Sequence, residues 1–423
     1  MTVPMVDDAH GIRRTQLDSG LRIVTEFLPG LRSVAVGYWV GTGSRDETDE
    51  LAGSSHFLEH LLFKGTERRH AADIAEAVES VGGDMNAFTG QEVTAFYMRM
   101  PDRHLATALD IMSDIVWSPA LRGDEVDSER QVILEEIRMR DDAPDDLVHE
   151  VFAGALFPGH PLGREVAGSE ETVSAVTRDQ IAEYHATHYR PGNVVVAVAG
   201  NVEHDDVVAQ VQATLPSGAR DRPARQHGAD AAAPERFASV DRPNEQAHVV
   251  LGMRGLRRDD PDRYALAVLD QVLGGGMSSR LFQEVREKRG LAYSVYSYRA
   301  AFQETGALAV YAGTAPERVE ETLEIVNAEL DRLVADGGVT EKELNGAKGH
   351  LTGSLALSLE SSSSRMHRIG RSELTMGEIP SLDDVVAAVE EVTPGDVARV
   401  IDRVLGSGER TLAAVGPVAS LSF

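Results

Sequence analysis

The order of apolar and polar positions predicts alternating strands and helices along the first half of the chain. Two stretches rich in β-branched residues, 21–28 and 33–40, are joined by Pro29-Gly30, which is typical of two strands connected by a turn. Further strands are predicted at 84–89, 93–100 and 193–200, and helices at 70–81, 102–117, 124–140 and 176–188. This mixture predicts a protein of the α/β class, of the α+β type.

The second half of the chain repeats the first. Val176-Thr177 and Gly200 match Val392-Thr393 and Gly416, with the same separation in each pair. Self-similarity at a fixed offset predicts two similar domains in tandem. The intervening stretch is rich in Pro, Gly, Ala and charge, which is typical of a linker. The predicted boundaries are 1–215 for the first domain, 216–236 for the linker and 237–423 for the second domain. In the second domain we expect strands at 248–253, 307–313 and 410–415, and helices at 279–288, 316–335 and 341–359.

Composition restricts the class of protein. At 423 residues the chain exceeds the usual single core, which agrees with two domains of about 200 residues each. Hydrophobic residues make up 42% and charged residues 26%, as in ordinary globular proteins. Cysteine is absent, so disulfides, thiolate metal sites and cysteine nucleophiles are excluded. Any metal must therefore be held by His, Asp or Glu.

The formal net charge of -27 argues against nucleic-acid binding, which requires a basic surface. This charge has two interpretations: it keeps the protein soluble, or it lines an acidic chamber that attracts basic peptides. No apolar run approaches the length of a membrane span, and the N-terminal stretch has no apolar signal-peptide core. We therefore expect a cytoplasmic protein without a membrane or nucleic-acid partner.

The strongest candidate chemistry lies in the stretch His-Phe-Leu-Glu-His, residues 56–60. On an α-helix, His56 and His60 lie one turn apart on one face, where two imidazoles can bind a divalent cation, zinc being favoured. Glu59 lies beside that position, where a carboxylate can take a proton from water. The order H-x-x-E-H, the inverse of H-E-x-x-H, is a metallopeptidase signature. The alternative is an exposed amphipathic helix with two solvated histidines.

A third metal ligand is expected on the helix predicted at 124–140. Glu129 and Glu136 are seven residues apart and therefore share a helix face, whereas Glu135 points about 100° away from Glu136. Most glutamates on such a helix are simply solvated, so the residues alone leave the choice open. At the repeat spacing, apolar and glycine positions correspond to the two histidines, so only the first half can bind the metal.

Three other features receive structural interpretations. Ser54 and Ser55 are candidate caps for the metal helix. His185 and His188 are three residues apart near a helix end, with no nearby carboxylate partner, which favours a structural role. The glycine-rich stretch 273–281 completes neither nucleotide-binding motif, which leaves a flexible loop or a substrate contact.

Together these residues resemble those of a known family. The chain is similar to the M16 metallopeptidases, which include pitrilysin, insulin-degrading enzyme and mitochondrial processing peptidase. It resembles in particular the short bacterial members, which are like the processing-peptidase β subunit. The resemblance covers nearly the whole chain, and implies two tandem homologous domains of LuxS/MPP-like fold, each a mainly antiparallel sheet packed with helices. It rests on His56-x-x-Glu59-His60, the glutamates Glu129 and Glu136, the stretch Asn86-Ala87-Phe88-Thr89, and Arg286 with Tyr293.

The resemblance implies a metal and a catalytic base. One zinc ion per chain would be held by His56, His60 and Glu136. Glu129 would support catalysis by orienting its neighbours. Glu59 would take the proton from water and pass it to the leaving amine.

The resemblance also implies how a substrate binds. A peptide would lie extended beside Asn86, Ala87 and Phe88 and add a strand to the sheet. Arg286 and Tyr293 would reach the substrate carbonyl, in an oxyanion-type role. Without the family, Asn86 is typical of a turn, whereas Arg286 and Tyr293 are typical of surface and core positions.

The function implied by the family is that of a zinc-dependent endopeptidase, which cuts unfolded or extended peptides inside a dimeric clamshell chamber. In the long family members the opposite half of the chamber lies in the same chain. Here a second chain must supply it, so we expect a homodimer with active sites completed in trans. The alternatives are the active half of a heterodimer with a second M16 subunit, and a non-catalytic partner subunit. Such partner subunits typically lose part of the metal motif, which this chain keeps.

Overall fold

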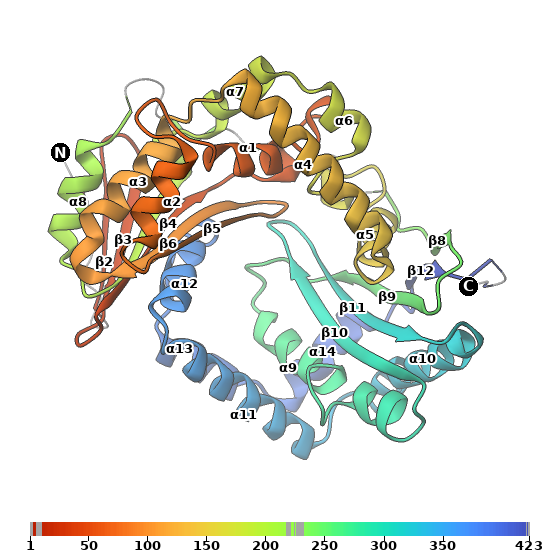
Figure 1. Ribbon diagram of the computed structural model, residues 1–423. Helices are drawn as coiled ribbons and strands as arrows, with labels where there is room; N and C mark the ends of the chain where they lie inside the picture. Colours follow the sequence, from red (N-terminus) through yellow and green to blue (C-terminus); the bar gives the residue numbers. More distant parts are fainter. Residues whose placement is uncertain are drawn as a thin grey trace. The chain divides into compact units, whose positions relative to one another are not determined.

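The computed structural model describes residues 3–5, 11–216, 221–223, 225, 232–419 and 421 (Figure 1). The chain forms two compact units, and neither is a continuous stretch. Unit 1 comprises Met1–Ile137, Glu165–His227 and Ser358–Ile379. Unit 2 comprises Arg138–Arg164, Gly228–Leu357 and Pro380–Phe423.

Unit 1 contains a seven-stranded sheet in the order β1-β2-β3-β7-β4-β6-β5. Its strands are β1 (Val3–Met5), β2 (Ile12–Gln16), β3 (Arg22–Phe27), β4 (Ser33–Val40), β5 (Asp84–Thr89), β6 (Thr94–Pro101) and β7 (Val194–Gly200). Strands β3 and β7 run parallel, and all other neighbours are antiparallel. Strand β5 pairs with β6 alone and therefore forms one edge of the sheet.

Helices cover both faces of this sheet. They are α1 (Ser54–Leu62), α2 (Ala71–Glu79), α3 (Leu105–Trp117), α4 (Gly123–Asp142), α6 (Glu170–Ala175), α7 (Arg178–His188), α8 (His204–Ala213) and α12 (Ser362–Thr375), with short 3-10 turns at η1 (Ser44–Asp46), η2 (Asp49–Leu51), η3 (Asp102–His104) and η5 (Pro191–Asn193). Side chains of β4 alternate between the two faces, as strand geometry requires. Val36 and Tyr38 pack in the core that includes α1, α3 and α4, whereas Ala35 and Trp39 pack against α12.

Helix α12 packs closely on the sheet, and a glycine on each side of the contact leaves room for a large side chain of the other element. A Cβ atom on Gly37 would lie 2.3 Å from the sulfur of Met366, and one on Gly370 would lie 2.2 Å from Nε1 of Trp39. Only a residue without a side chain fits at either position. The approach brings the indole N–H of Trp39 to 3.5 Å from Met366 Sδ.

Unit 2 contains a five-stranded sheet in the order β10-β11-β9-β12-β8. Its strands are β8 (Phe237–Asp241), β9 (Ala247–Gly255), β10 (Ala292–Ala301), β11 (Gly306–Thr314) and β12 (Thr411–Gly416). Only β12 and β8 run parallel. The helices are α5 (Pro144–Leu156), α9 (Arg263–Leu273), α10 (Val319–Asp336), α11 (Glu341–Ser358), α13 (Leu382–Glu390) and α14 (Pro394–Leu405), with short turns at η4 (Pro161–Gly163), η6 (Phe282–Glu287) and η7 (Pro316–Arg318).

The two sheets repeat one topology. The order β3-β7-β4-β6-β5 in unit 1 corresponds strand for strand to β8-β12-β9-β11-β10 in unit 2, including the single parallel pair. This repetition confirms the predicted fold class of two similar α/β domains with mainly antiparallel sheets. The predicted boundaries 1–215 and 237–423 stay a prediction, and residues 217–220, 224 and 226–231 of the predicted linker lie outside the described residues.

Each half of the chain contributes one helix to the other half's sheet. Helix α5 follows α4 but packs on β9 and β12 of unit 2, where Val148, Phe152 and Leu156 join the core (Figure 1). Helix α12 belongs to the second half but packs on β3, β4 and β7 of unit 1. This exchange is why the compact units are discontinuous in sequence.

Most predicted elements are present, with one notable difference. The helix predicted at 279–288 is a π-helical turn, η6, rather than a regular α-helix. Such widened turns are rare and occur mostly at functional positions. Among the described residues, every helix is too short or too polar to cross a lipid bilayer.

Candidate metal centre

The motif residues lie on helix α1, which has one strongly buried side. The residues that α1 buries in the core of unit 1 are Phe57, Leu58, Leu61 and Leu62. This apolar stripe orients the helix. His56, Glu59 and His60 remain only partly buried, and so are available for chemistry.

The start of α1 is fixed by a carboxylate from the preceding loop. Glu47 accepts hydrogen bonds from the backbone N–H of Gly53, at 2.8 Å, and of Ser55, at 2.6 Å. Gly53 is the capping residue and has a left-handed backbone with φ 94°, whereas Ser54 and Ser55, the expected caps, lie inside the helix. A negative charge at this end satisfies free N–H groups and complements the helix dipole.

Three donor atoms converge between α1 and α4. Nε2 of His56 lies 3.8 Å, and Nε2 of His60 lies 3.5 Å, from Oε2 of Glu136. The exposed fractions of the three side chains are 18%, 17% and 42%, so the position is open to solvent on the Glu136 side. Glu135, the alternative ligand, is exposed. Among the described residues, no other group of three His, Asp or Glu side chains has ligand atoms this close together.

Glu129 contacts the back of His60. Its Oε1 atom lies 2.8 Å from Nδ1 of His60, and its Oε2 atom lies 2.6 Å from Nζ of Lys64. The Glu129 side chain is only 6% exposed. Burial alone would raise the pKa of Glu129, but the contacts with His60 and Lys64 lower it overall. An ionised Glu129 holds the proton of His60 on Nδ1, which directs the free Nε2 lone pair toward Glu136.

The two histidines have different electrostatic surroundings. Burial, with a smaller effect of His60, lowers the pKa of His56 to about 4, so its ring is neutral at pH 7. Burial alone would lower the pKa of His60 as well, but the hydrogen bond with Glu129 and the charges of Glu136 and Glu129 raise it overall. A neutral imidazole is the form that binds a metal, so His56 needs no deprotonation.

Glu59 is the third motif residue, and its carboxylate is partly buried. Burial raises the pKa of Glu59, and the nearby Glu136 adds to this. Thr89 and the charge of His60 act in the opposite direction. A carboxylate with a raised pKa is a stronger base than an exposed one, which suits a proton acceptor.

The donor set fits zinc. Two imidazole nitrogens and one carboxylate oxygen are a common ligand set of catalytic zinc sites, which keep a fourth position open. Zinc–nitrogen bonds of about 2.0–2.1 Å in a tetrahedron place donor atoms about 3.3–3.5 Å apart. The separations of 3.5 and 3.8 Å are close to that range. His56, His60 and Glu136 could therefore hold one zinc ion after small side-chain adjustments.

The predicted substrate residues lie on the edge strand β5, which packs beside α1. Asn86 lies within the strand and not in a turn, and its Oδ1 accepts a hydrogen bond from the N–H of Ala87 at 2.8 Å. Phe88 packs edge-on against Trp39, with ring centroids 5.7 Å apart. An edge strand offers unpaired backbone groups to an incoming extended chain.

Arg286 and Tyr293 lie together in unit 2, whereas the candidate metal donors lie in unit 1. Cζ of Arg286 lies 4.6 Å from the ring centroid of Tyr293, a cation–π contact. Arg286 is carried by the π-helical η6, and Tyr293 occupies a bulge of the edge strand β10, between Ala292 and Ser294. Tyr293 is 79% exposed. The core position inferred without the family is therefore wrong for Tyr293.

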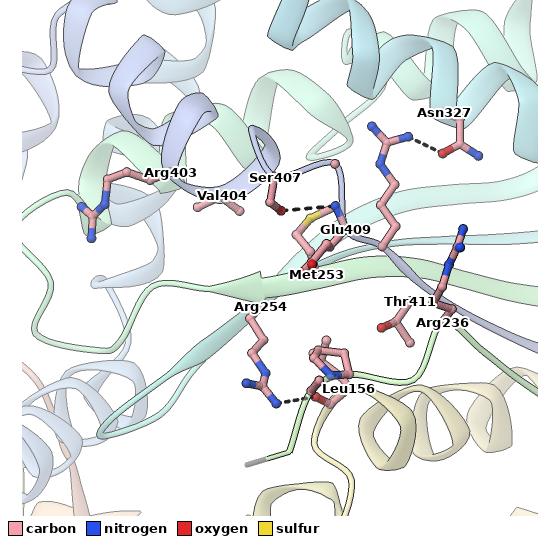
Figure 2. Close-up of a pocket in the computed structure, with 14 residues that line it drawn as sticks. Leu156, Arg236, Met253, Arg254, Asn327, Arg403, Val404, Ser407, Glu409 and Thr411 are labelled. Carbon is pink, nitrogen blue, oxygen red and sulfur yellow. Dashed lines mark hydrogen bonds between the residues drawn. The ribbon is translucent and has the colours of Figure 1, made fainter. Parts of the chain in front are cut away.

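A separate cavity of about 630 Å³ lies wholly within unit 2 (Figure 2). Arginines line it, but Arg403 is paired with Asp260 at 2.8 Å, and Arg410 is bonded to Asn327. None of the predicted site residues lines this cavity. It therefore has no part in the candidate centre.

His185 and His188 have the contacts of structural histidines. Nε2 of His185 donates to the carbonyl of Val116 at 2.9 Å, and Nδ1 of His188 lies 2.9 Å from the hydroxyl of Thr42. The two rings thus bond to different partners, as in the structural interpretation.

Two residues that support the centre, Lys64 and Glu47, were not predicted from the sequence. Lys64 follows His60 by four residues, so helical spacing placed it near the histidine's face, but its pairing with Glu129 required the position of α4. Glu47 lies in an irregular loop, and no periodic pattern relates it to α1.

Two family models match consecutive parts of the chain between residues 22 and 351. A model described as Insulinase (Peptidase family M16) matches residues 22–170, and one described as Peptidase M16 inactive domain matches residues 175–351. The first match contains all three candidate metal donors. The second begins within the first predicted domain and covers much of the half in which no metal motif was found.

Relatives resemble the chain from end to end. An uncharacterized zinc protease of Streptomyces coelicolor is 49% identical, over 99% of this chain and 93% of the relative. The uncharacterized zinc protease YmxG of Bacillus subtilis is 40% identical, over 97% of this chain and 99% of the relative. A solved structure described as a peptidase M16 inactive domain from Pseudomonas fluorescens superposes with a TM-score of 0.89 at 25% identity, covering 97% of this chain and 100% of that chain.

Proposed function

The chain belongs to peptidase family M16, and from that premise we propose that it is a zinc-dependent endopeptidase acting on unfolded or extended peptides. The observation that carries the proposal is the approach of two imidazole nitrogens to one carboxylate oxygen, at 3.8 and 3.5 Å, from the inverted motif and from α4. The names of full-length relatives as zinc proteases support the choice of metal.

The proposed chemistry assigns separate tasks to the residues of the centre. His56, His60 and Glu136 hold the zinc, which when bound polarises a carbonyl and lowers the pKa of water. Glu59 takes a proton from the water that attacks the scissile carbonyl. It then passes this proton to the amine as the C–N bond breaks. Glu129 keeps His60 in the orientation and tautomer that zinc binding requires.

We propose that the substrate adds to β5 as an extra strand along Asn86, Ala87 and Phe88. Backbone pairing of this kind requires an extended segment and depends little on side chains. Folded proteins are therefore poor substrates, whereas oligopeptides and flexible segments are good ones. A preference for basic peptides stays a prediction from the net charge of -27.

We also propose that two copies of the chain form a homodimer in which Arg286 and Tyr293 of one copy serve the zinc centre of the other. Mixing two inactive variants tests this. In a mixed dimer of Glu59→Gln and Arg286→Ala, completion in trans creates one site with both defects and one intact site. Mixing should then restore activity to either variant, whereas completion within one chain leaves every site defective and mixing has no effect.

Two alternatives follow from the same family. In a heterodimer the protein would be inactive alone and active only with a second M16 subunit. A non-catalytic subunit would neither bind zinc tightly nor cut peptides. The retained donors His56, His60 and Glu136 argue against the second alternative. Gel filtration of the protein expressed alone tests the first, since a homodimer elutes at twice the chain mass.

The central experiment compares wild type with Glu59→Gln on a quenched, basic, unstructured peptide, with zinc content measured in both. Glutamine has the shape of glutamate but cannot take the proton, so the variant should retain zinc and lose at least about a hundredfold in kcat. Glu135→Gln, an exposed change on α4, is the matched control and should be fully active. If wild type holds zinc yet cuts no peptide, the endopeptidase proposal is refuted.

A further inference from the structure

Several buried side-chain oxygen atoms of the described residues lack a hydrogen bond of normal geometry, and three of them belong to residues around Glu59. These three are Oε2 of Glu59, Oγ1 of Thr89 and Oη of Tyr189. The carboxylate oxygen is an acceptor, and the two hydroxyls are donors. Leaving each of them unpaired costs about 1–3 kcal/mol, so three such atoms in one protein core require an explanation.

These three residues come from elements that meet behind the motif. Thr89 ends the edge strand β5, where it pairs across the hairpin with Thr94 of β6. The hydroxyl of Thr89 lowers the pKa of Glu59, so the two groups are neighbours even though their geometry is not yet that of a hydrogen bond.

Tyr189 approaches the same place from the end of α7. The hydroxyl of Tyr184 lies 2.8 Å from that of Ser55, which ties α7 to α1. Burial, and secondly the negative charge of Glu59, raise the pKa of Tyr189, which is only 5% exposed, whereas the hydroxyl of Thr94 beside it lowers that pKa. The phenol is therefore neutral at pH 7, and its hydroxyl can donate to a carboxylate.

We propose that Thr89 and Tyr189 are positioning residues for Glu59, whose hydroxyls donate to the carboxylate directly or through one bridging water. The inference rests on the proposed function, because it assigns Glu59 the proton transfer. Two fixed donors hold the carboxylate in one rotamer, so that it meets the attacking water in the right direction. Because Thr89 ends β5, a substrate strand paired along β5 also fixes the residue that orients the base.

The first test is Tyr189→Phe, which removes only the hydroxyl. A purely structural tyrosine with an unpaired buried hydroxyl would lose nothing, since removing an unsatisfied polar atom is neutral or stabilising. If Tyr189 positions Glu59, the variant should have a kcat about tenfold lower than wild type. This factor corresponds to the lower end of the free energy of a hydrogen bond to a charged group. KM and zinc content should stay near wild type. Unchanged kcat would overturn the role of Tyr189.

Tyr38→Phe is the matched control. The Tyr38 hydroxyl is also fully buried, but it lies 2.6 Å from the hydroxyl of Ser113 in the core. This variant should melt at a lower temperature and keep its kcat. Of the two phenylalanine variants, only Tyr189→Phe should therefore lose activity.

Thr89 is tested by a conservative pair of variants. Thr89→Val keeps the shape and removes the donor, so kcat should fall about tenfold with little change in KM. Thr89→Ser restores the hydroxyl and should recover most of the activity. Equal kcat values in the valine and serine variants would show that the hydroxyl has no positioning role.

An activity-independent measurement separates this inference from the proposed function. A double-mutant cycle of Tyr189→Phe and Glu59→Gln on the unfolding of the full-length, metal-free protein measures the coupling of the two side chains. Non-additive shifts in unfolding support the inference even if no peptidase activity is found. Additive shifts refute it, whatever the activity of the wild type.

Discussion

The sharpest quantitative prediction concerns Glu129, which touches no candidate metal position but holds two partners. In Glu129→Gln the amide has one oxygen and one NH2 group in place of two carboxylate oxygens. In the wild type, Nδ1 of His60 and Nζ of Lys64 lie 2.8 and 2.6 Å from the two carboxylate oxygens. The single amide oxygen of the variant can accept a hydrogen bond from one of these groups but not from both. The negative charge that raises the pKa of His60 is also lost.

The magnitude follows from the lost contact. One hydrogen bond to a charged group contributes about 1.5–3 kcal/mol. Since 1.4 kcal/mol is a factor of about ten in an equilibrium constant, zinc affinity should fall roughly 10- to 100-fold. This agrees with the usual cost of about 10–100-fold for losing a residue that orients a metal ligand.

The assay is competition for zinc with a fluorescent chelator at pH 7, together with activity measured against free zinc concentration. Glu129→Gln should need more zinc for half-maximal activity and regain a large part of its kcat at saturation. Glu135→Gln, on the exposed side of the same helix, is the control and should match wild type. If Glu129→Gln binds zinc as tightly as the control, Glu129 does not orient His60.

Further predictions concern stability. Gly370→Ala would place a Cβ atom 2.2 Å from Nε1 of Trp39 and should lower the free energy of unfolding by about 1–3 kcal/mol in chemical denaturation. Gly349→Ala on α11, with open space around it, should instead stabilise by up to about 1 kcal/mol, and equal effects of the two would contradict the packing argument. Hydrogen bonds with Arg280 and Thr340 lower the pKa of Glu343 to about 2, so its contribution to stability is fully present above the ordinary glutamate pKa and is lost as the pH falls toward 2. Glu343→Gln should therefore destabilise at pH 7 and have little effect near pH 2, and a difference from wild type that stays constant with pH would refute this.

Much of the fold and of the candidate site could be predicted from the spacing of residues within short stretches of the chain. The spacing of His56 and His60 brings them to one face of any α-helix, whatever that helix packs against. The apolar stripe on α1 and the β-branched strands were also readable, because periods of 3.6 and 2 are properties of the chain itself. The repeat of Val176 and Gly200 at Val392 and Gly416 was sufficient to predict two similar domains, because similar patterns of apolar residues and glycines favour similar folds.

Contacts between distant segments were decided by packing. Residue spacing placed Glu129 and Glu136 on one helix face but did not decide between them, and only the placement of α4 against α1 brings Glu136 to the histidine nitrogens and Glu129 to the back of His60. The exchange of α5 and α12 was not readable, since an amphipathic helix shows that it has a buried face but not which sheet covers it. Two backbone irregularities were also not predicted, namely the π-helical turn that contains Arg286 and the bulge at Tyr293. Such irregularities arise from the fit between neighbouring elements and produce no periodic pattern in the sequence.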